Sequence, residues 1–258
     1  MVPLPRFQLP LPLNGPPPGY GWEECGMSAS ASRSFKTGVH RRDEFFGQAA
    51  YCAICGLFML EEDLGVIQLC YILKDLSPRA WNRLKDLNWI SPQANDGPRH
   101  DPRNGLALCL NHRDLFENYD CIIRYFPENR KFVLINYSDI PDLQEFHGKA
   151  IALDINDRDA PYPSLFILHE MRVRGFQPEQ PLDPAIPDNI TWQDWILSGG
   201  LVNQDTFSHD LPRRQNMLPL QSTPPRQSTH SGRMVFRGFV CVFLFLFAFF
   251  VWFWKYIA

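Results

Sequence analysis

Two pairs of metal-ligating side chains stand out in the sequence, each with a two-residue spacer. They are Cys52 with Cys55, which is followed by Gly56, and Cys109 with His112. The short spacer lets both members of a pair reach one ion, and three thiolates with one imidazole make a tetrahedral set that suits structural zinc. Because the neighbouring residues are apolar, the alternative is that the cysteines are small buried hydrophobic side chains. The spacing predicts a structural Zn²⁺ site at these four residues.

Longer stretches of sequence surround the two pairs, at Tyr51–Gly56, Gln68–Leu73 and Arg103–Glu117. Together they resemble the HNH endonuclease family, which is built on a ββα-metal motif. The part from Asn104 to Glu117 is the most specific. The resemblance implies an α+β fold with a ββα core, an added hairpin and a C-terminal helix.

Two further stretches, Phe146–Ala150 and Trp192–Trp195, are similar to fungal proteins that carry an HNH domain. With them the resemblance extends over residues 42–198. In zinc-bearing members of the family, cysteine pairs bracket the motif, which agrees with the predicted zinc site.

The family's phosphodiester hydrolysis needs a His that deprotonates water, an Asn that orients this His, and a second His that binds a divalent metal. The resemblance places these roles on Tyr71, Asn104 and Arg113. A Tyr has an ordinary pKa near 10 and is mostly protonated at pH 7, and Arg offers a metal no lone pair. Only Asn104 is kept, so we expect a catalytically degenerate module that acts in binding or as a scaffold.

The alternative is a working endonuclease with a rearranged site, in which His112, His100 or Asp101 takes over a lost role and Mg²⁺ or Mn²⁺ is the catalytic metal. A product without a selected function is a third interpretation. The position of His112 separates the first two. A His112 that points at the three cysteines favours structural zinc, whereas one that lies beside Tyr71 favours catalysis.

The elements that must position these residues follow from hydrophobic patterns and turn signals. Ser77 followed by Pro78 predicts a helix start, because Ser caps well and Pro fits the first helical turn. We expect strands at 50–53, 66–73, 105–110, 121–126 and 131–136, and helices from 77, at 112–118 and at 164–174, with a short amphipathic segment at 191–197.

Composition sets the domain organisation. The net charge is −3, which is not the strongly basic footprint of a general DNA binder, so nucleic acid is only a weakly supported partner. The odd number of cysteines, 7, does not favour a secreted disulfide framework. We expect a disordered Pro/Ser-rich tail at 1–41, whose Leu-Pro repeats can dock a protein partner. The HNH-like module at 42–198 is followed by a flexible tether at 199–233 and a membrane anchor at 234–258.

The predicted anchor rests on the run from Phe239 to Trp254, which contains no charged residue. Such a run spans roughly 24 Å of a hydrocarbon core that is about 30 Å thick. Five arginines precede the span and only Lys255 follows it. The positive-inside rule then predicts a single-pass protein in a lipid bilayer, with its body in the cytosol. A buried core helix or an error in the gene model is the alternative.

Overall fold

The computed structural model describes residues 1–29, 34–43, 51–57, 67–178 and 183–198. The chain divides into two compact units, Met1–His209 and Asp210–Ala258, and all the described residues belong to the first. Within the described ranges, no helix is both long enough and apolar enough to cross a membrane. The predicted tether and anchor lie outside the described residues.

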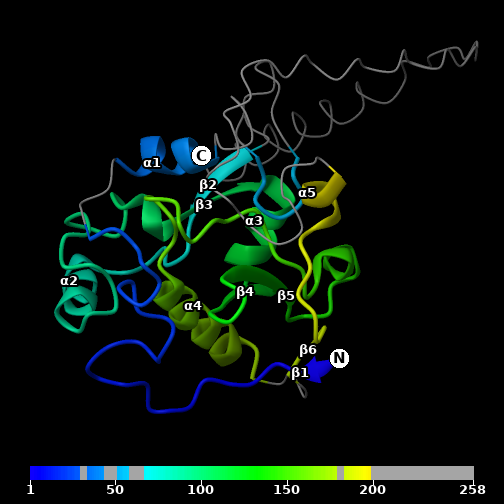
Figure 1. Cartoon of the computed structure of the whole chain (residues 1–258), viewed down its shortest axis with the longest axis horizontal. Coiled ribbons are helices and arrows are strands. Elements are labelled where there is room, and N and C mark those ends of the chain that lie inside the picture. The colour runs from blue at the N-terminus through cyan, green and yellow to red at the C-terminus, as the bar shows by residue number, and fades with distance from the viewer. Residues whose placement is uncertain (30–33, 44–50, 58–66, 179–182, 199–258) are drawn as a thin grey trace, which may run out of the picture. The chain divides into compact units, whose positions relative to one another are not determined.

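The described residues form helices and antiparallel two-stranded sheets, so the fold is α+β, as predicted (Figure 1). The elements in chain order are β1 (Val2–Pro3), α1 (Phe35–Asp43), β2 (Ile67–Tyr71), α2 (Pro78–Asp86), the 3-10 helix η2 (Pro102–Asn104), β3 (Gly105–Cys109), α3 (Leu110–Glu117), β4 (Cys121–Phe126), β5 (Lys131–Asn136), the 3-10 helix η3 (Pro141–Phe146), α4 (Pro163–Phe176), β6 (Ala185–Ile186) and α5 (Asp194–Ser198).

A ββα unit holds the residues of interest. β2 pairs antiparallel with β3, so that Ile67 lies opposite Cys109 at one end and Tyr71 lies opposite Gly105 at the other. α3 follows β3 directly, and every residue of β3 is buried. The predicted ββα arrangement is therefore present. The prediction of a strand at 50–53 is wrong at residue 53, because residues 53–55 form a turn.

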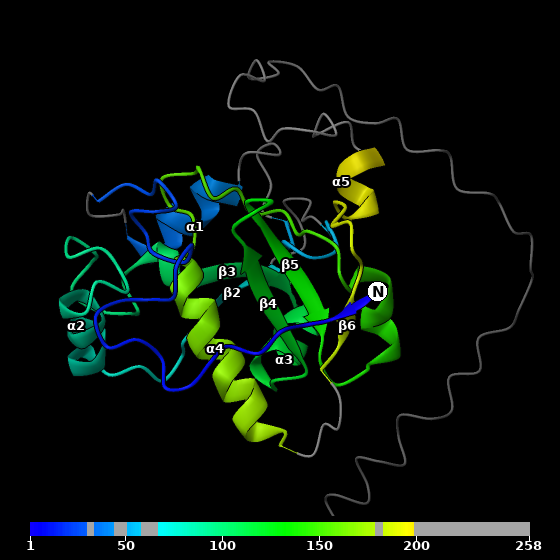
Figure 2. The same cartoon turned by 60° about the horizontal axis from the view of Figure 1, so that its bottom comes forward.

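The second hairpin, β4 with β5, lies beside this unit, and Arg130 in the turn between its strands has a φ of 52°. α4 packs along β4 (Figure 2). The main hydrophobic core joins the two hairpins and α4, and it includes Leu106, Ile123, Phe132 and Phe166. The added hairpin and C-terminal helix expected from the sequence thus close one side of the ββα unit.

α2 begins where the sequence predicts. The Ser77 hydroxyl accepts a hydrogen bond from the Ala80 amide at 3.2 Å, and Pro78 occupies the first helical turn. Trp81 is fully buried, and its indole N–H donates to the Asn95 carbonyl at 2.8 Å. This contact fixes the loop that leads from α2 towards η2.

The prediction of a disordered tail at 1–41 is wrong for residues 1–29. This segment runs from β1 past α4 towards α2 (Figures 1 and 2), and it buries Leu4, Trp22 and Met27. β1 pairs with β6, and the Trp22 indole donates to the Asn88 side chain at 3.0 Å. Composition alone misses this packing, because a few widely spaced large apolar side chains supply the burial in a stretch rich in Pro and Gly.

α1 falls partly inside the predicted tail, and it too packs on the module. Its Val39 is fully buried, and the Arg42 guanidinium donates to the Gly105 carbonyl at 3.1 Å. Two glycines allow α1 to approach the body closely, one on the helix and one on β3. A Cβ on Gly38 would lie 2.4 Å from the Pro102 ring, and one on Gly105 would lie 2.5 Å from the Phe35 ring. The folded body therefore begins before residue 42.

Candidate functional site

The four predicted metal ligands meet at one end of the ββα unit. The ligand atoms of Cys52, Cys55, Cys109 and His112 all lie within 4.8 Å of one another. His112 Nδ1 is 3.1 Å from the Cys109 sulfur and 3.5 Å from the Cys52 sulfur. The sulfurs of Cys55 and Cys109 are 4.0 Å apart. This cluster could hold a metal ion such as zinc.

Local structure explains why the two pairs converge. Residues 52–56 form a tight turn, in which the Gly56 amide donates to the Cys52 carbonyl at 2.9 Å and Gly56 has a φ of 71°. The Ala53 amide donates to the Ala107 carbonyl at 3.0 Å, which fixes the turn against β3. Cys109 ends β3 and is the N-cap residue of α3, so His112 projects from the first turn of that helix. The cluster therefore joins a turn, a strand end and a helix start.

The geometry fits tetrahedral zinc. A Zn–S bond of about 2.3 Å places two sulfur ligands roughly 3.8 Å apart in a tetrahedron, which is near the 4.0 Å between Cys55 and Cys109. Cys52, Cys109 and His112 are buried, and Cys55 is half-buried. Three thiols and an imidazole enclosed in this way match the donors that zinc takes in structural sites.

The electrostatics of the cluster favour a thiolate. Hydrogen bonding with Cys52 and Cys55 holds the pKa of the Cys109 thiol well below its usual value. Burial by itself lowers the pKa of His112, but hydrogen bonding with Cys109 and Cys55 outweighs burial and raises this pKa to about 9. Burial raises the pKa of Cys52. A thiolate at Cys109 is the form that binds a metal, and metal binding would displace the protons held by the other ligands.

Tyr71, which the resemblance assigns to the general-base position, lies at the opposite end of the hairpin from the cysteine cluster. Four steps along β2 separate it from the cluster end, which is about 13 Å at 3.3 Å per residue. Its ring packs against Phe35 of α1, with a centroid separation of 4.5 Å. α1 therefore packs against the side chain that the resemblance assigns to the general-base position.

Arg113, which the resemblance assigns to the metal-ligand position, lies on α3. Its guanidinium pairs with the adjacent Asp114 at 2.6 Å, and the Asp114 side chain raises the pKa of Arg113. Among the described residues, no hydrogen bond or ion pair joins Arg113 to Tyr71. The polar partner of Arg113 is therefore Asp114, and the aromatic partner of Tyr71 is Phe35.

Asn104 is fully buried and bonded to the backbone on both sides of its amide. Its Oδ1 accepts from the Leu73 amide at 3.0 Å, and its Nδ2 donates to the Pro98 carbonyl at 2.9 Å. The side chain therefore fixes the chain just after β2 to the loop before η2. The backbone carbonyl of Asn104 accepts from the Ile72 amide at 2.9 Å, so the backbone as well as the side chain of this residue holds the end of β2.

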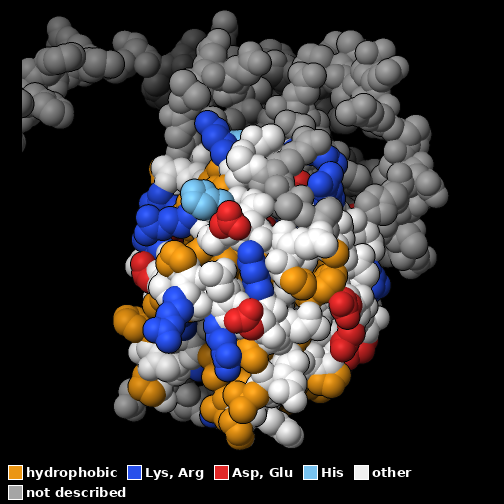
Figure 3. Space-filling view, turned by 90° about the vertical axis from the view of Figure 1, so that its left-hand side faces the viewer, with side chains coloured by type: hydrophobic (Ala, Val, Ile, Leu, Met, Phe, Trp, Pro, Cys, Tyr) orange, Lys and Arg blue, Asp and Glu red, His pale blue; other side chains and the backbone are white. Residues whose placement is uncertain are grey.

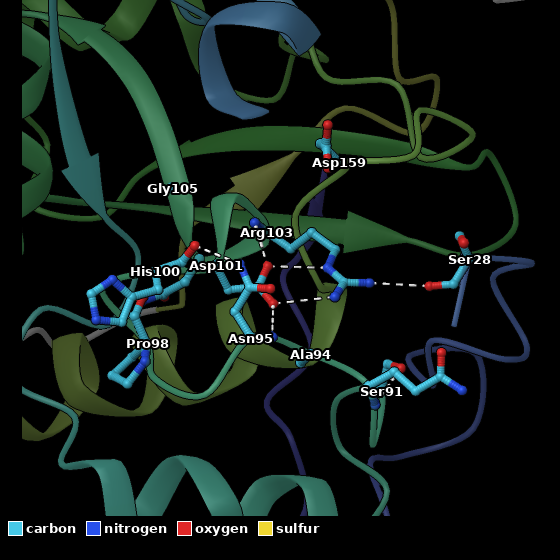
Figure 4. Close-up of polar contacts among 12 residues, drawn as sticks. Ser28, Ser91, Ala94, Asn95, Pro98, His100, Asp101, Arg103, Gly105 and Asp159 are labelled. Carbon is cyan, nitrogen blue, oxygen red and sulfur yellow. Dashed lines mark hydrogen bonds and ion pairs between the residues drawn. The ribbon is translucent and has the colours of Figure 1, made fainter. Parts of the chain in front are cut away.

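His100 and Asp101 are the candidates for a rearranged catalytic site, and Figure 4 shows how they lie. The Asp101 carboxylate faces the Arg103 guanidinium, with both nitrogen–oxygen distances at 3.1 Å, and both side chains are fully buried. The imidazole of His100 points away from this carboxylate and is exposed. The Asp101 carboxylate is thus held in a buried ion pair. Neither His100 nor Asp101 belongs to the cluster that contains His112 and the cysteines.

Two important residues were not identified from the sequence. Phe35 covers Tyr71, and Arg103 forms the buried pair with Asp101 while it also donates to the Ser28 carbonyl at 3.0 Å. A signal for the second existed, since Asp-Pro-Arg at 101–103 has the pattern of an Asp-capped 3-10 turn. Phe35 carries no such local signal, because its partners are distant in sequence.

Residues 52–124 match a family model described as HNH endonuclease. The matched segment runs from the first two cysteines through the ββα unit and into β4. The predicted resemblance is confirmed, and the chain carries an HNH-nuclease-like domain. No curated protein and no solved structure matched the chain. The likeness to fungal members therefore stays a prediction.

Proposed function

We propose that the chain is a catalytically degenerate HNH-nuclease-like module, which acts as a binding or scaffold domain. One observation carries this proposal. The imidazole of His112 lies among the three cysteine thiols, whereas Tyr71 lies at the other end of the hairpin. A His held in a metal cluster at that distance cannot activate a water beside position 71.

Further contacts support the loss of catalysis. The Phe35 ring lies against Tyr71, the Asp101 carboxylate is bound to Arg103, and the Asn104 amide is engaged with backbone groups. Nucleic acid is a weakly supported partner. On the face that includes α1 and α2, Lys and Arg side chains are interspersed with acidic and apolar ones (Figure 3). A general DNA binder gathers its basic side chains into a patch or stripe.

The test of catalysis is a plasmid-nicking assay on the purified full chain with Mg²⁺, with Mn²⁺ and with EDTA. We expect no metal-dependent nicking. Cleavage by the unaltered chain that EDTA abolishes would establish the alternative, an active metal-dependent endonuclease with a rearranged site.

We further propose that the cysteine cluster binds one structural Zn²⁺ per chain. Elemental analysis of the purified full chain measures the content, and Cys109→Ser should reduce it at least tenfold. The matched control is Cys121→Ser, because Cys121 is also buried but lies outside the cluster. Equal zinc in the two variants would exclude this ligand set.

We also propose that residues 234–258 anchor the body to a bilayer, with the body in the cytosol. The support is the uncharged run from Phe239 to Trp254 and the arginines that precede it. Carbonate washing of membranes tests the anchor. An integral protein stays in the pellet, and release into the wash would contradict the proposal.

A further inference from the structure

The last described helix, α5, rests directly on the turn that carries two of the metal ligands. The indole N–H of Trp195 donates to the carbonyl of Ile54 at 2.7 Å, across 141 positions of sequence. Ile54 lies between Cys52 and Cys55. Trp195 therefore hydrogen-bonds the backbone of the predicted metal turn itself.

The packing at this contact depends on a glycine. Gly56 has a φ of 71°, and a Cβ built there would lie 2.4 Å from the Trp195 ring. The indole thus lies directly against the turn backbone. A larger residue at position 56 would occupy the space that the indole fills. Any change in the shape of the turn alters the surface that receives Trp195.

The chain just before α5 is held by different contacts. The Gln193 amide donates to the Ala150 carbonyl at 3.0 Å, and the Ala150 amide donates to the Thr191 carbonyl at 2.7 Å. Within α5, Ile196 is buried in a small apolar cluster with Trp192. Residues 191–193 are thus held by backbone bonds that do not involve the metal turn, whereas the Trp195 indole bonds the turn directly and also packs against the apolar cluster.

We propose that metal binding by the four-ligand cluster controls the docking of α5. With the ion bound, Cys52 and Cys55 hold the turn in the shape that accepts Trp195. When the ion is removed, the turn relaxes, the Trp195 indole loses its acceptor on the turn and α5 frays, while residues 191–193 stay on the body. This inference rests on the proposed zinc site.

Hydrogen exchange of the full chain in detergent micelles, before and after chelation, tests the coupling. The reporter amides are those of Ile196 and Leu197, which donate to the Gln193 carbonyl at 2.9 and 3.3 Å. We expect their exchange to accelerate at least tenfold after metal removal, while the Gln193 amide changes less than twofold. Unchanged exchange in α5 after complete removal of the metal would overturn the inference. A chain that binds no metal would overturn the zinc proposal as well, so the two failures are distinguishable.

A pair of glycine variants tests the contact itself. Gly56→Ala and Gly26→Ala place a side chain at the same φ of 71°, but a Cβ at Gly26 meets nothing within 4 Å. We expect Gly56→Ala to accelerate α5 exchange at least fivefold in the metal-loaded chain and Gly26→Ala to leave it unchanged. Equal exchange in both variants would mean that Trp195 does not hold α5 on the turn, and the inference would fail.

Discussion

The side-chain amide of Asn104 hydrogen-bonds the backbone of Leu73. Its Oδ1 accepts the Leu73 amide at 3.0 Å, and its Nδ2 lies 3.4 Å from the Leu73 carbonyl. The same Nδ2 donates to Pro98 at 2.9 Å. The resemblance assigns this Asn the orientation of a general base, whereas its amide here joins the end of β2 to the loop before η2. These contacts give Asn104 a role in holding the fold.

Replacement of Asn104 should therefore reduce stability. Asn104→Ala leaves the buried Leu73 amide without its acceptor and the Pro98 carbonyl without its donor. We expect the free energy of unfolding to fall by about 2–4 kcal/mol, because an unsatisfied buried polar group costs about 1–3 kcal/mol. Urea denaturation measures the change. Asn111→Ala, at an exposed position on α3, is the control and should change stability by less than about 0.5 kcal/mol.

Restoration of the family's histidines should not be sufficient for catalysis. In the Tyr71→His, Arg113→His variant, the new imidazole lies beneath Phe35, whose ring centroid is 4.5 Å from the Tyr71 ring in the unaltered chain. We expect Mg²⁺-dependent plasmid nicking at least tenfold faster when Phe35→Ala is added. Equal nicking by the double and triple variants would show that Phe35 does not restrict position 71.

The sequence predicted those parts of the site that depend on neighbours in the chain. The Cys52–Cys55 and Cys109–His112 spacings and the Ser77 cap are local, and the structure brings the four ligands together and confirms the cap. α1 was missed because what holds it is distant in sequence, namely the contacts of Phe35 and Val39 with Gly105. The packing of the N-terminal segment was missed for the same reason.

The buried pair of Asp101 and Arg103 should show strong coupling (Figure 4). Arg103→Met leaves a buried carboxylate without its counter-charge and should lower the free energy of unfolding by about 3–5 kcal/mol. Adding Asp101→Asn removes that charge, so the double variant should recover at least half of the loss. Lys74→Met breaks the more exposed pair with Glu117 and should cost at most about 1 kcal/mol. If Arg103→Met were as mild as Lys74→Met, the buried pair would not stabilise the loop before η2.

His169 should make the protein sensitive to acid. Its ring is stacked on Phe116 at 4.0 Å and is 2% exposed, and its Nδ1 has no hydrogen-bond partner among the described residues. Burial lowers the pKa of His169 from 6.5 to about 3. Below pH 6.5 the His169 imidazole is therefore protonated in the unfolded chain, whereas in the folded chain it stays neutral down to about pH 3. The stabilisation is present above pH 6.5 and is lost as the pH falls through this window.

His169→Phe keeps a ring at this position and removes the titration. Between pH 7 and pH 5, the unaltered chain should lose about 2 kcal/mol more stability than this variant, since a tenfold difference in proton affinity between the folded and unfolded chains corresponds to about 1.4 kcal/mol. Urea denaturation of both chains at the two pH values gives the difference directly. The comparison cancels every other titrating group common to the two chains. An equal loss of stability in the two chains would contradict the prediction. It would mean that His169 binds a proton as readily in the folded protein as in the unfolded one, despite its burial against Phe116.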